Sequence, residues 1–305
     1  MTDKKYVLGI DIGGTNIRAG MIDEAYNLSN CIIESSRQLQ DENAAVQKLI
    51  DFVQNYISQY VKGVNLQGIA IGFPSTVDRE RKRVLSTPNI LGFTNVNIVD
   101  TFYEQLQIPT YINRDVNMLM LFDMYSGNIP DEGVTAGFYL GTGLGNAISI
   151  DGHLLRGKNG VAAELGHIPE RGLKAACGCG NEGCVEVFAS GKYLKYLCDT
   201  YFQETFIGDI FKEHGNHEII QKFVMDLAIP VATEINILDP DYIILGGGLP
   251  QMEGFPKELL EEAIHKYTRK PYPEQGLEFI YSVPMQENGV IGAGIYAFKQ
   301  MKQRR

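Results

Sequence analysis

A histidine and three cysteines lie close together in the sequence, with the spacing of a metal-binding loop. His167 is followed by Cys177, Cys179 and Cys184, and glycines separate the three thiols. One imidazole and three thiolates make a closed tetrahedral ligand set for Zn²⁺, which leaves no open position for catalysis. Disulfide pairing and unreactive free thiols are the alternatives. We therefore expect loop 167–184 to hold a structural zinc ion.

Two carboxylates flank this loop, at Glu164 and Glu186. Carboxylates held rigidly near a metal are good bidentate acceptors for the vicinal hydroxyls of a sugar. His167 can bind zinc through one ring nitrogen and donate from the other, so the ion would fix its tautomer. Without the metal, either glutamate would more often be a solvated surface residue.

Three glycine-rich turns have the chemistry of a phosphate or nucleotide site. Paired glycines bring backbone N–H groups close to a phosphate, and an adjacent threonine adds a hydroxyl. An aspartate in the first turn can hold Mg²⁺, directly or through water. Glycines that serve only tight turns or close packing are the alternative. The turns are Asp11-Ile12-Gly13-Gly14-Thr15-Asn16, Gly141-Thr142-Gly143-Leu144-Gly145 and Leu245-Gly246-Gly247-Gly248.

Asp115 stands between an apolar run and a helical pattern, in Ile112-Asn113-Arg114-Asp115. A carboxylate at such an edge can act in catalysis. It can equally serve only as a helix N-cap.

The elements that must position these residues alternate between strand and helix. Strands are predicted at 6–10 and 17–22 around the first turn and at 136–140 and 147–150 around the second, which indicates an internal repeat. Helices are predicted at 46–61, 116–125, 218–238 and 289–305, with Pro230 kinking or breaking the third. Strands are predicted at 68–73 and 242–245, and we expect Cys31 and Cys198 in the core. The pattern favours an α/β fold.

The length of 305 residues exceeds what one hydrophobic core fills, so we expect two lobes. The formal net charge of −10 argues against a general nucleic-acid surface, because such surfaces neutralise phosphates with Lys and Arg. Asp11 interrupts the first apolar run far short of a signal-peptide core, and no later run is long enough to span a bilayer. These features predict a cytoplasmic protein that binds neither nucleic acid nor membrane.

Seven motifs, taken in chain order, resemble the ROK family of bacterial sugar kinases and repressors. The match covers essentially the whole chain, and segment 164–186 is specific for this family, whereas the glycine turns alone indicate only the wider actin/hexokinase group. The motifs are Asp11-x-Gly-Gly-Thr, Gly72-Phe73-Pro74, Arg114-Asp115-x-Asn117, Gly141-Thr142-Gly143-x-Gly145, Glu164-x-Gly-His167, Cys177-x-Cys179-x₄-Cys184 and Leu245-Gly-Gly-Gly.

The resemblance implies a two-lobed fold of the actin/hexokinase (ribonuclease H-like) type, with the active site in a cleft between the lobes. The N-terminal lobe would span residues 1–115 and be completed by the C-terminal helix 289–305. The C-terminal lobe would span residues 116–288 and contain the zinc loop 167–184 and the adenosine-binding loop. Assembly as a homodimer or a dimer of dimers is implied as well.

The resemblance further implies an ATP- and Mg²⁺-dependent kinase that phosphorylates a hexose at its 6-hydroxyl. Asp115 would be the general base, and a carboxylate with an ordinary pKa is ionised at pH 7 and ready to accept the proton. The sugar would be held by Glu164, His167, Glu186, Arg114, Asn89 and Ser75. ATP and Mg²⁺ would be held by Asp11, Gly13, Gly14, Thr15, Asn16, Gly141, Thr142, Gly143, Gly145, Gly246, Gly247 and Gly248.

Two residues depart from the pattern of many sugar kinases in the family. Arg114 stands where Asn usually precedes the catalytic Asp, and Ser75 stands where Gly usually follows the Gly-x-Pro turn. Arg only donates hydrogen bonds, whereas Asn donates and accepts, so ordinary glucokinase specificity is not expected. Both departures resemble the bacterial D-allose kinases of the family, as do Ser86-Thr87-Pro88-Asn89 and Gly166-His167-Ile168-Pro169. D-allose is therefore the implied substrate.

Three other functions compete with this interpretation. Glucose or N-acetylmannosamine is the alternative substrate within the kinase class. A sugar-responsive DNA-binding regulator would need an additional helix-turn-helix domain, whereas the phosphate turn begins at Asp11. A catalytically silent sugar-binding protein would need a damaged Asp115 or damaged glycine turns, and both are intact.

Overall fold

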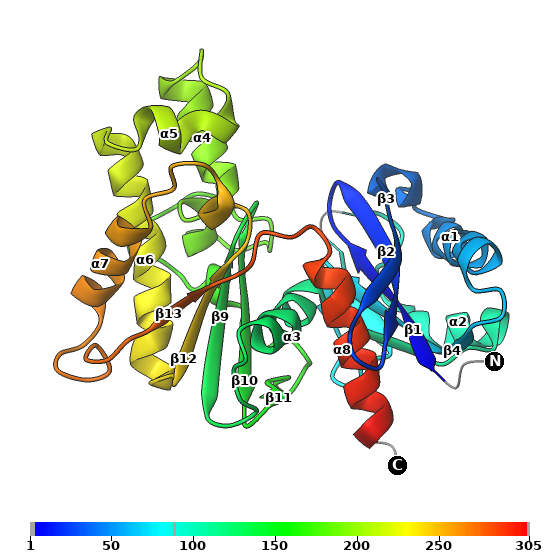
Figure 1. Ribbon diagram of the computed structural model, residues 1–305. Coiled ribbons are helices and arrows are strands. Elements are labelled where there is room, and N and C mark those ends of the chain that lie inside the picture. Colours follow the sequence, from blue (N-terminus) through cyan, green and yellow to red (C-terminus); the bar gives the residue numbers. More distant parts are fainter. Residues whose placement is uncertain (1–3, 88–89, 304–305) are drawn as a thin grey trace. The chain divides into compact units, whose positions relative to one another are not determined.

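The computed structural model describes residues 4–87 and 90–303, which form two compact units (Figure 1). Unit 1 comprises residues 1–126, 156–162 and 285–305. Unit 2 comprises residues 127–155 and 163–284. Each unit has its own hydrophobic core. Among the described residues, no helix is long and apolar enough to cross a bilayer.

Unit 1 is built on a five-stranded sheet of order β3-β2-β1-β4-β8, with a small three-stranded sheet of order β5-β6-β7. The first three strands are antiparallel, and β4 and β8 run parallel to β1. Its elements are β1 (Lys5–Ile12), β2 (Asn16–Asp23), β3 (Leu28–Ser35), η1 (Ser36–Leu39), α1 (Ala45–Tyr60), β4 (Asn65–Phe73), β5 (Thr76–Val77), β6 (Arg83–Ser86), β7 (Val96–Asn97), α2 (Ile98–Leu106), β8 (Thr110–Arg114), α3 (Asp115–Ser126) and α8 (Asn288–Gln303).

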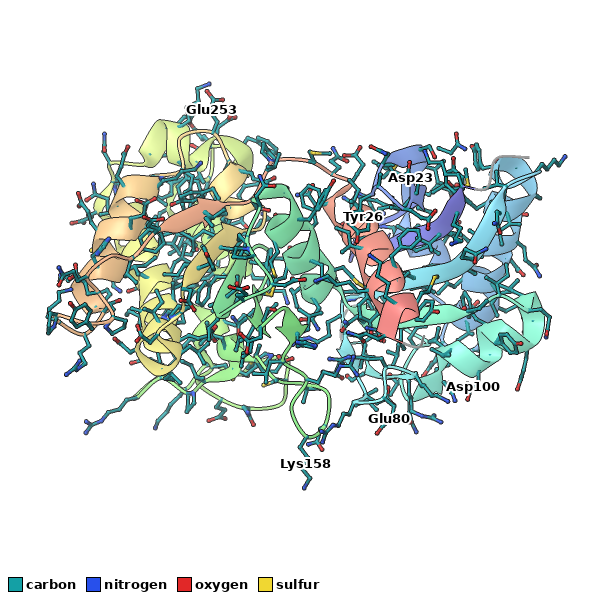
Figure 2. The ribbon with its side chains drawn as sticks, turned by 60° about the horizontal axis from the view of Figure 1, so that its bottom comes forward. Asp23, Tyr26, Glu80, Asp100, Lys158 and Glu253 are labelled. Carbon is teal, nitrogen blue, oxygen red and sulfur yellow. The ribbon has the colours of Figure 1, made fainter. Side chains whose placement is uncertain are left out.

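Helix α8 packs against β1, β2 and β4, and also against α3. The approach is close at Gly9, where an added Cβ would lie 2.3 Å from the Val290 carbonyl oxygen. At the turn between β2 and β3, Asp23 accepts the Ala25 and Asn27 backbone N–H groups at 2.9 Å (Figure 2). The ring of Tyr26 in this turn packs edge-on against a tyrosine of α3. These contacts fix the hairpins of unit 1 against its helices.

Unit 2 is built on a second five-stranded sheet, of order β11-β10-β9-β12-β13. Strands β9, β10 and β11 are antiparallel, and β12 and β13 run parallel to β9. The elements of unit 2 are β9 (Val134–Leu140), β10 (Leu144–Ile150), β11 (His153–Leu154), η2 (Leu165–His167), η3 (Val185–Val187), α4 (Gly191–Tyr201), η4 (Ile207–Asp209), α5 (Ile210–His214), α6 (Glu218–Leu238), β12 (Tyr242–Gly246), η5 (Leu249–Gln251), α7 (Lys257–Tyr267) and β13 (Phe279–Tyr281).

The two sheets share one strand order and one pattern of directions, so the predicted internal repeat is confirmed. The hairpin β1–β2 turns between Ile12 and Ile17, and the hairpin β9–β10 turns between Leu140 and Leu144. In both sheets a parallel strand follows on the other side of the first strand. The two-lobed α/β fold expected from the sequence is therefore present, and each unit presents one glycine-rich hairpin turn.

Two expectations about single elements were wrong, in part or in whole. Pro230 does not break α6 into two pieces, because buried residues on both sides of the proline, including Leu227 and Val231, pack into the same core. This packing outweighs the one backbone hydrogen bond that proline removes. Cys31 is only half-buried on β3, whereas Cys198 is buried as expected.

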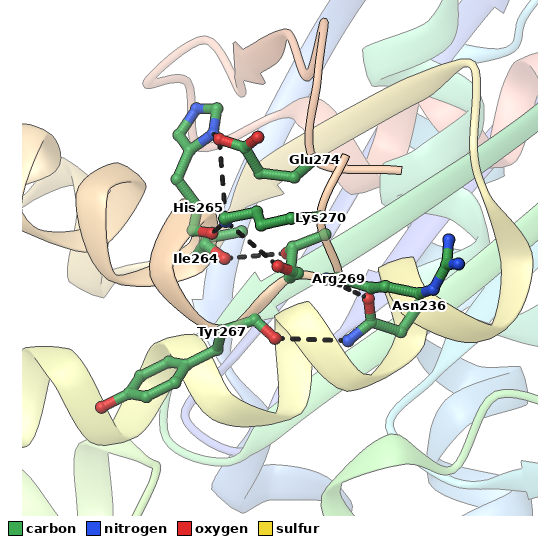
Figure 3. A network of polar contacts seen from close by, with 8 residues as sticks. Asn236, Ile264, His265, Tyr267, Arg269, Lys270 and Glu274 are labelled. Carbon is green, nitrogen blue, oxygen red and sulfur yellow. Dashed lines mark hydrogen bonds and ion pairs between the residues drawn. The ribbon is translucent and has the colours of Figure 1, made fainter. Parts of the chain in front are cut away.

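Helices α6 and α7 are joined by a network of polar contacts (Figure 3). The Asn236 amide donates to the Tyr267 carbonyl at 3.3 Å and accepts the Arg269 backbone N–H at 2.7 Å. His265 contacts Glu274, with Nδ1 2.9 Å from Oε1, and Lys270 donates to the His265 carbonyl oxygen. The network fixes the end of α7 to α6, and α6 in turn packs on the sheet of unit 2.

Candidate functional site

Asp11 and Asp115 lie at the carboxyl ends of the parallel strands of unit 1. Asp11 is opposite Gly72, and Gly72 is opposite Asn113, so three neighbouring strands end in register. Asp115 follows directly on β8 and begins α3. A Cβ added at Gly72 would lie 3.7 Å from Asp11 Oδ1 and 3.5 Å from the Asp115 Cα. Ligand sites of open α/β sheets occur at this edge.

The environment of the two carboxyl groups changes their acidity. Burial raises the pKa of Asp11, and the nearby Arg18 guanidinium opposes that rise. Burial, together with the negative charge of Asp11, raises the pKa of Asp115 to about 7. The expectation of an ordinary pKa for Asp115 was therefore wrong, because that expectation ignored desolvation and the neighbouring acid. At pH 7 this group is poised between its acid and base forms.

Two polar contacts that were not predicted from the sequence lie at or next to these acids. Arg18 Nη1 lies 3.2 Å from Asp11 Oδ2. The buried Asn117 amide of α3 donates to Asn113 Oδ1 of β8 at 2.8 Å, which joins the first turn of the helix to the strand that precedes Asp115. The hairpin register already places Arg18 opposite Asp11, and the i,i+4 spacing of the asparagines was visible in the sequence. Those two patterns would have found the contacts.

The first glycine-rich turn joins β1 to β2 directly beyond Asp11. The Gly13 N–H donates to the Asn16 carbonyl at 2.8 Å, and the Ser36 N–H donates to the Thr15 carbonyl at 2.9 Å. A Cβ added at Gly14 would meet no atom within 4 Å. Gly14 and Thr15 are both exposed, so their backbone N–H groups can reach a phosphate.

Ser75 and Arg114, the other described candidates of unit 1, have different surroundings. Ser75 Oγ is buried without a hydrogen-bond partner among residues 4–87 and 90–303. Arg114 is buried, and its Nη1 donates to the Ala162 carbonyl at 2.7 Å. Asn89 lies outside the described residues.

A cavity of about 500 Å³ in unit 2 is bounded by the second and third glycine-rich turns. The second turn is tied to the start of α4, because the Gly191 N–H donates to the Gly141 carbonyl at 2.7 Å. Apolar side chains and two lysines form the rest of the wall. The lining residues are Gly141, Thr142, Gly191, Lys192, Leu194, Lys195, Ile207, Gly248, Leu249 and Met252. The size and the mostly apolar lining suit a nucleoside.

Three other candidate glycines of unit 2, Gly143, Gly246 and Gly247, make close packing contacts and do not line this cavity. A Cβ at Gly143 would lie 2.4 Å from Glu186 Oε2, and one at Gly246 would lie 2.9 Å from the Tyr139 ring. Gly247 has φ +89°, and its Cβ would lie 2.5 Å from the Leu140 carbonyl oxygen. Gly145 lies in β10 opposite Tyr139. Because Gly143, Gly246 and Gly247 have no side chains, Glu186, Tyr139 and Leu140 can pack directly against these turns.

The four predicted metal ligands meet in unit 2. One ligand atom from each of His167, Cys177, Cys179 and Cys184 lies within 4.8 Å of all the others. Cys177 Sγ is 3.6 Å from His167 Nδ1, and Cys179 Sγ is 3.6 Å from Cys184 Sγ. A tetrahedron with Zn–S bonds of about 2.3 Å has edges of about 3.8 Å. All five cysteines are free thiols, so the disulfide alternative is excluded in this structure and the donor set fits Zn²⁺.

Both candidate carboxylates lie beside this cluster. Glu164 Oε2 is 3.6 Å from His167 Nε2, the ring nitrogen that faces away from Cys177. Glu186 Oε2 accepts the Leu144 N–H at 2.9 Å, which joins the metal cluster to the second glycine-rich turn. One short segment therefore connects the metal ligands, the two acids and the wall of the nucleoside-sized cavity.

The chain matches one protein family over nearly its whole length, and it is similar to characterised proteins and solved structures. Residues 7–300 match the sequence model of the ROK family. A glucokinase of Thermotoga maritima is 25% identical over 310 residues, which cover 95% of this chain and 96% of the relative. An N-acetyl-D-glucosamine kinase of Photobacterium profundum is 30% identical, with 82% of this chain and 86% of the relative covered. The crystal structure of a ROK hexokinase from Thermus thermophilus superposes with a TM-score of 0.77 at 26% identity, over 98% of this chain and 99% of that chain.

Proposed function

This chain belongs to the ROK family, and from that premise we propose that it transfers the γ-phosphoryl group of ATP to the 6-hydroxyl of a hexose, with D-allose as the hexose. The observation that carries the kinase assignment is Asp115. It lies at the carboxyl end of the parallel strands β1, β4 and β8, with a pKa near the operating pH and a second acid beside it. The kinase names of the relatives from Thermotoga maritima and Photobacterium profundum support the same reaction class.

In the proposed reaction, Asp115 accepts the proton of the sugar 6-hydroxyl while that oxygen bonds to the γ-phosphorus. The bond between the γ-phosphorus and the bridging oxygen breaks, and ADP leaves with the electron pair. A base with a pKa near 7 is ionised in a large fraction of molecules and still accepts a proton readily. Bound Mg²⁺ would neutralise phosphate charge, and Asp11 is the acid in unit 1 placed to hold it.

The nucleoside of ATP would occupy the cavity between Gly141 and Gly248, with its flat base against the apolar wall. The phosphates would bind the exposed N–H groups of the glycine-rich turns. A Cβ at Gly248 would meet no protein atom within 4 Å, so protein packing does not require a glycine there. A bound nucleoside would occupy that space and would explain the glycine.

Glu164, His167 and Glu186 are the proposed sugar ligands of unit 2. His167 presents Nδ1 to the thiol cluster, so its Nε2 side is available to Glu164 and to a hydroxyl. Zn²⁺ bound by the four ligands would fix the ring and the loop, and it takes no part in phosphoryl transfer.

The choice of D-allose rests on Arg114 and Ser75. The Arg114 guanidinium holds segment 156–162 through the Ala162 carbonyl, so this residue would shape the sugar pocket by positioning that segment. Ser75 offers a buried hydroxyl in need of a partner, which a sugar hydroxyl can supply. Both residues distinguish this chain from the glucokinase pattern.

A coupled ADP-release assay tests the proposal with D-allose, glucose, mannose, fructose, N-acetylglucosamine and N-acetylmannosamine. We expect the highest kcat/KM with D-allose. A higher value for another hexose would disprove the choice of sugar and leave the kinase assignment intact. No sugar-dependent ADP release with any of the six would disprove both.

A further inference from the structure

Arg81 is a buried cation that the proposed kinase reaction does not use. It lies in the turn between β5 and β6 and is only 5% exposed. Its Nη1 donates to the Val77 carbonyl at 2.9 Å and to the Gly160 carbonyl at 2.8 Å. This nitrogen therefore ties the turn to segment 156–162, within unit 1.

The other edge of the Arg81 guanidinium is unsatisfied. Nε and Nη2 are both buried and have no hydrogen-bond partner in the part of the chain that the structure describes. These two nitrogens form the side-on fork of a guanidinium, whose parallel N–H groups match two oxygens of a carboxylate or phosphate. A buried donor without an acceptor costs free energy, and two on one fork favour a missing oxyanion.

Two further arginines, Arg114 and Arg156, lie close enough to act on this group. Burial, against the opposing effect of Tyr296 and together with the positive charges of Arg156 and Arg114, lowers the pKa of Arg81 to about 10. The nearby acid Asp78 is already occupied, because its Oδ1 accepts the backbone N–H groups of Lys82 and Arg83 at 2.8 Å. Arg81 and Arg114 both donate to carbonyls of segment 156–162, and Arg156 begins that segment, so three arginines meet there in a chain whose formal net charge is −10.

The sequence around the cluster is basic as well. Residues 78–83 read Asp-Arg-Glu-Arg-Lys-Arg, and Lys158 lies in the segment that Arg81 contacts. Glu80 and Lys158, both labelled in Figure 2, are exposed residues of these two stretches. The local field thus attracts anions although the protein as a whole is acidic.

We infer that Arg81, Arg114 and Arg156 form an oxyanion site for a phosphate group, with the Nε and Nη2 edge of Arg81 as its bidentate donor. Inorganic phosphate and the phosphate group of a hexose 6-phosphate both carry the oxygens that this site would bind. Because the Arg81 fork is buried, we expect segment 156–162 to shift when the anion binds; its glycines at 157 and 160 have φ +70° and +85°. The site does not depend on the proposed kinase activity.

Isothermal titration calorimetry with the full chain tests the site without turnover. We expect inorganic phosphate to bind in the presence of a saturating non-hydrolysable ATP analogue, so that the nucleotide site is already filled. Arg156→Gln should weaken phosphate binding by about tenfold, the effect of one charge-assisted hydrogen bond. Arg81→Lys keeps the charge, loses the fork and should weaken binding at least as much. Lys158→Gln is the matched control, because it removes a cation from the same segment outside the cluster.

A parallel titration with hexose 6-phosphate distinguishes the two sources. Competition between hexose 6-phosphate and inorganic phosphate would identify the sugar phosphate as a ligand, and binding of phosphate alone would identify the free anion. Thermal unfolding of each variant verifies that it is folded. The inference is wrong if the ATP analogue abolishes phosphate binding, if neither anion binds, or if Arg156→Gln and Lys158→Gln weaken binding equally. It is also wrong if folded Arg81→Lys binds phosphate with unchanged affinity.

Discussion

Burial and the negative charge of Asp11 raise the pKa of Asp115, and the two acids lie at the ends of β1 and β8, on either side of Gly72 in the strand between them. A pair of carboxyl groups this close resists double ionisation. Arg18 favours the ionised form of Asp11, so the proton that the pair retains belongs chiefly to Asp115. The pair of acids therefore sets the pH at which Asp115 becomes ionised and can act as the base.

The first prediction is a pH dependence of activity. Because the pKa of Asp115 is raised to about 7 and the base must be ionised, kcat/KM should fall about tenfold per pH unit below pH 7 and level off above it. Asp11→Asn removes the neighbouring charge and should move this inflection to lower pH. The measurement is kcat/KM for the sugar from pH 5 to 9 at saturating Mg²⁺ and ATP.

Asp51→Asn, on an exposed acid of α1, is the control and should leave the inflection in place. An inflection that stays near pH 7 in Asp11→Asn would show that Asp11 does not set the acidity of the base.

The second prediction concerns the base itself. Asp115→Asn should lower kcat by at least about 100-fold while sugar binding by calorimetry persists, because the amide cannot accept the proton. The same variant should unfold at a higher temperature than the wild type at pH 8. The folded-state pKa lies above the unfolded value of 3.8, so the wild type loses stability as the pH rises from about 4 to 7. Near-normal turnover in Asp115→Asn would contradict the assignment.

The third prediction is one zinc ion per chain by elemental analysis. Cys179→Ser combined with Cys184→Ser removes two of four ligands and should lose the metal and lower the melting temperature. Cys31→Ser, on a cysteine outside the cluster, should keep both. Zinc retained at one equivalent in the double variant would exclude these ligands.

The fourth prediction uses two neighbouring glycines with different surroundings. Gly248→Ala adds a methyl group that meets no protein atom within 4 Å, so it should leave the melting temperature unchanged and raise KM for ATP several-fold. Gly247→Ala places a Cβ at φ +89° and 2.5 Å from the Leu140 carbonyl oxygen, so it should lower the melting temperature. An unchanged KM for ATP in Gly248→Ala would argue against the cavity as the nucleotide site.

Local patterns in the sequence were sufficient for the hairpins and for the metal cluster. The apolar runs on either side of each glycine-rich turn predicted β1–β2 and β9–β10, because a hairpin needs only neighbouring residues. The ligands at 167, 177, 179 and 184 were predicted together for the same reason, since they lie in one short loop.

Features that depend on distant segments were not predictable in this way. Pro230 was expected to disturb α6, but the core on both sides of it comes from residues far away in the chain. The burial of Arg81 depends on segment 156–162, and the acidity of Asp115 depends on Asp11, about 100 residues earlier. No local pattern encodes which charges a fold brings together.

The contact between Gly9 and Val290 also has a consequence for synthesis on the ribosome. The first strand to emerge is covered by α8, which is translated last among the described elements. One face of β1, β2 and β4 therefore stays unprotected during nearly all of translation, while unit 2 is already complete at residue 284. Unit 1, although it begins first, can complete its packing only after α8 has been synthesised, and a nascent chain stalled before α8 would present an apolar sheet to chaperones and proteases.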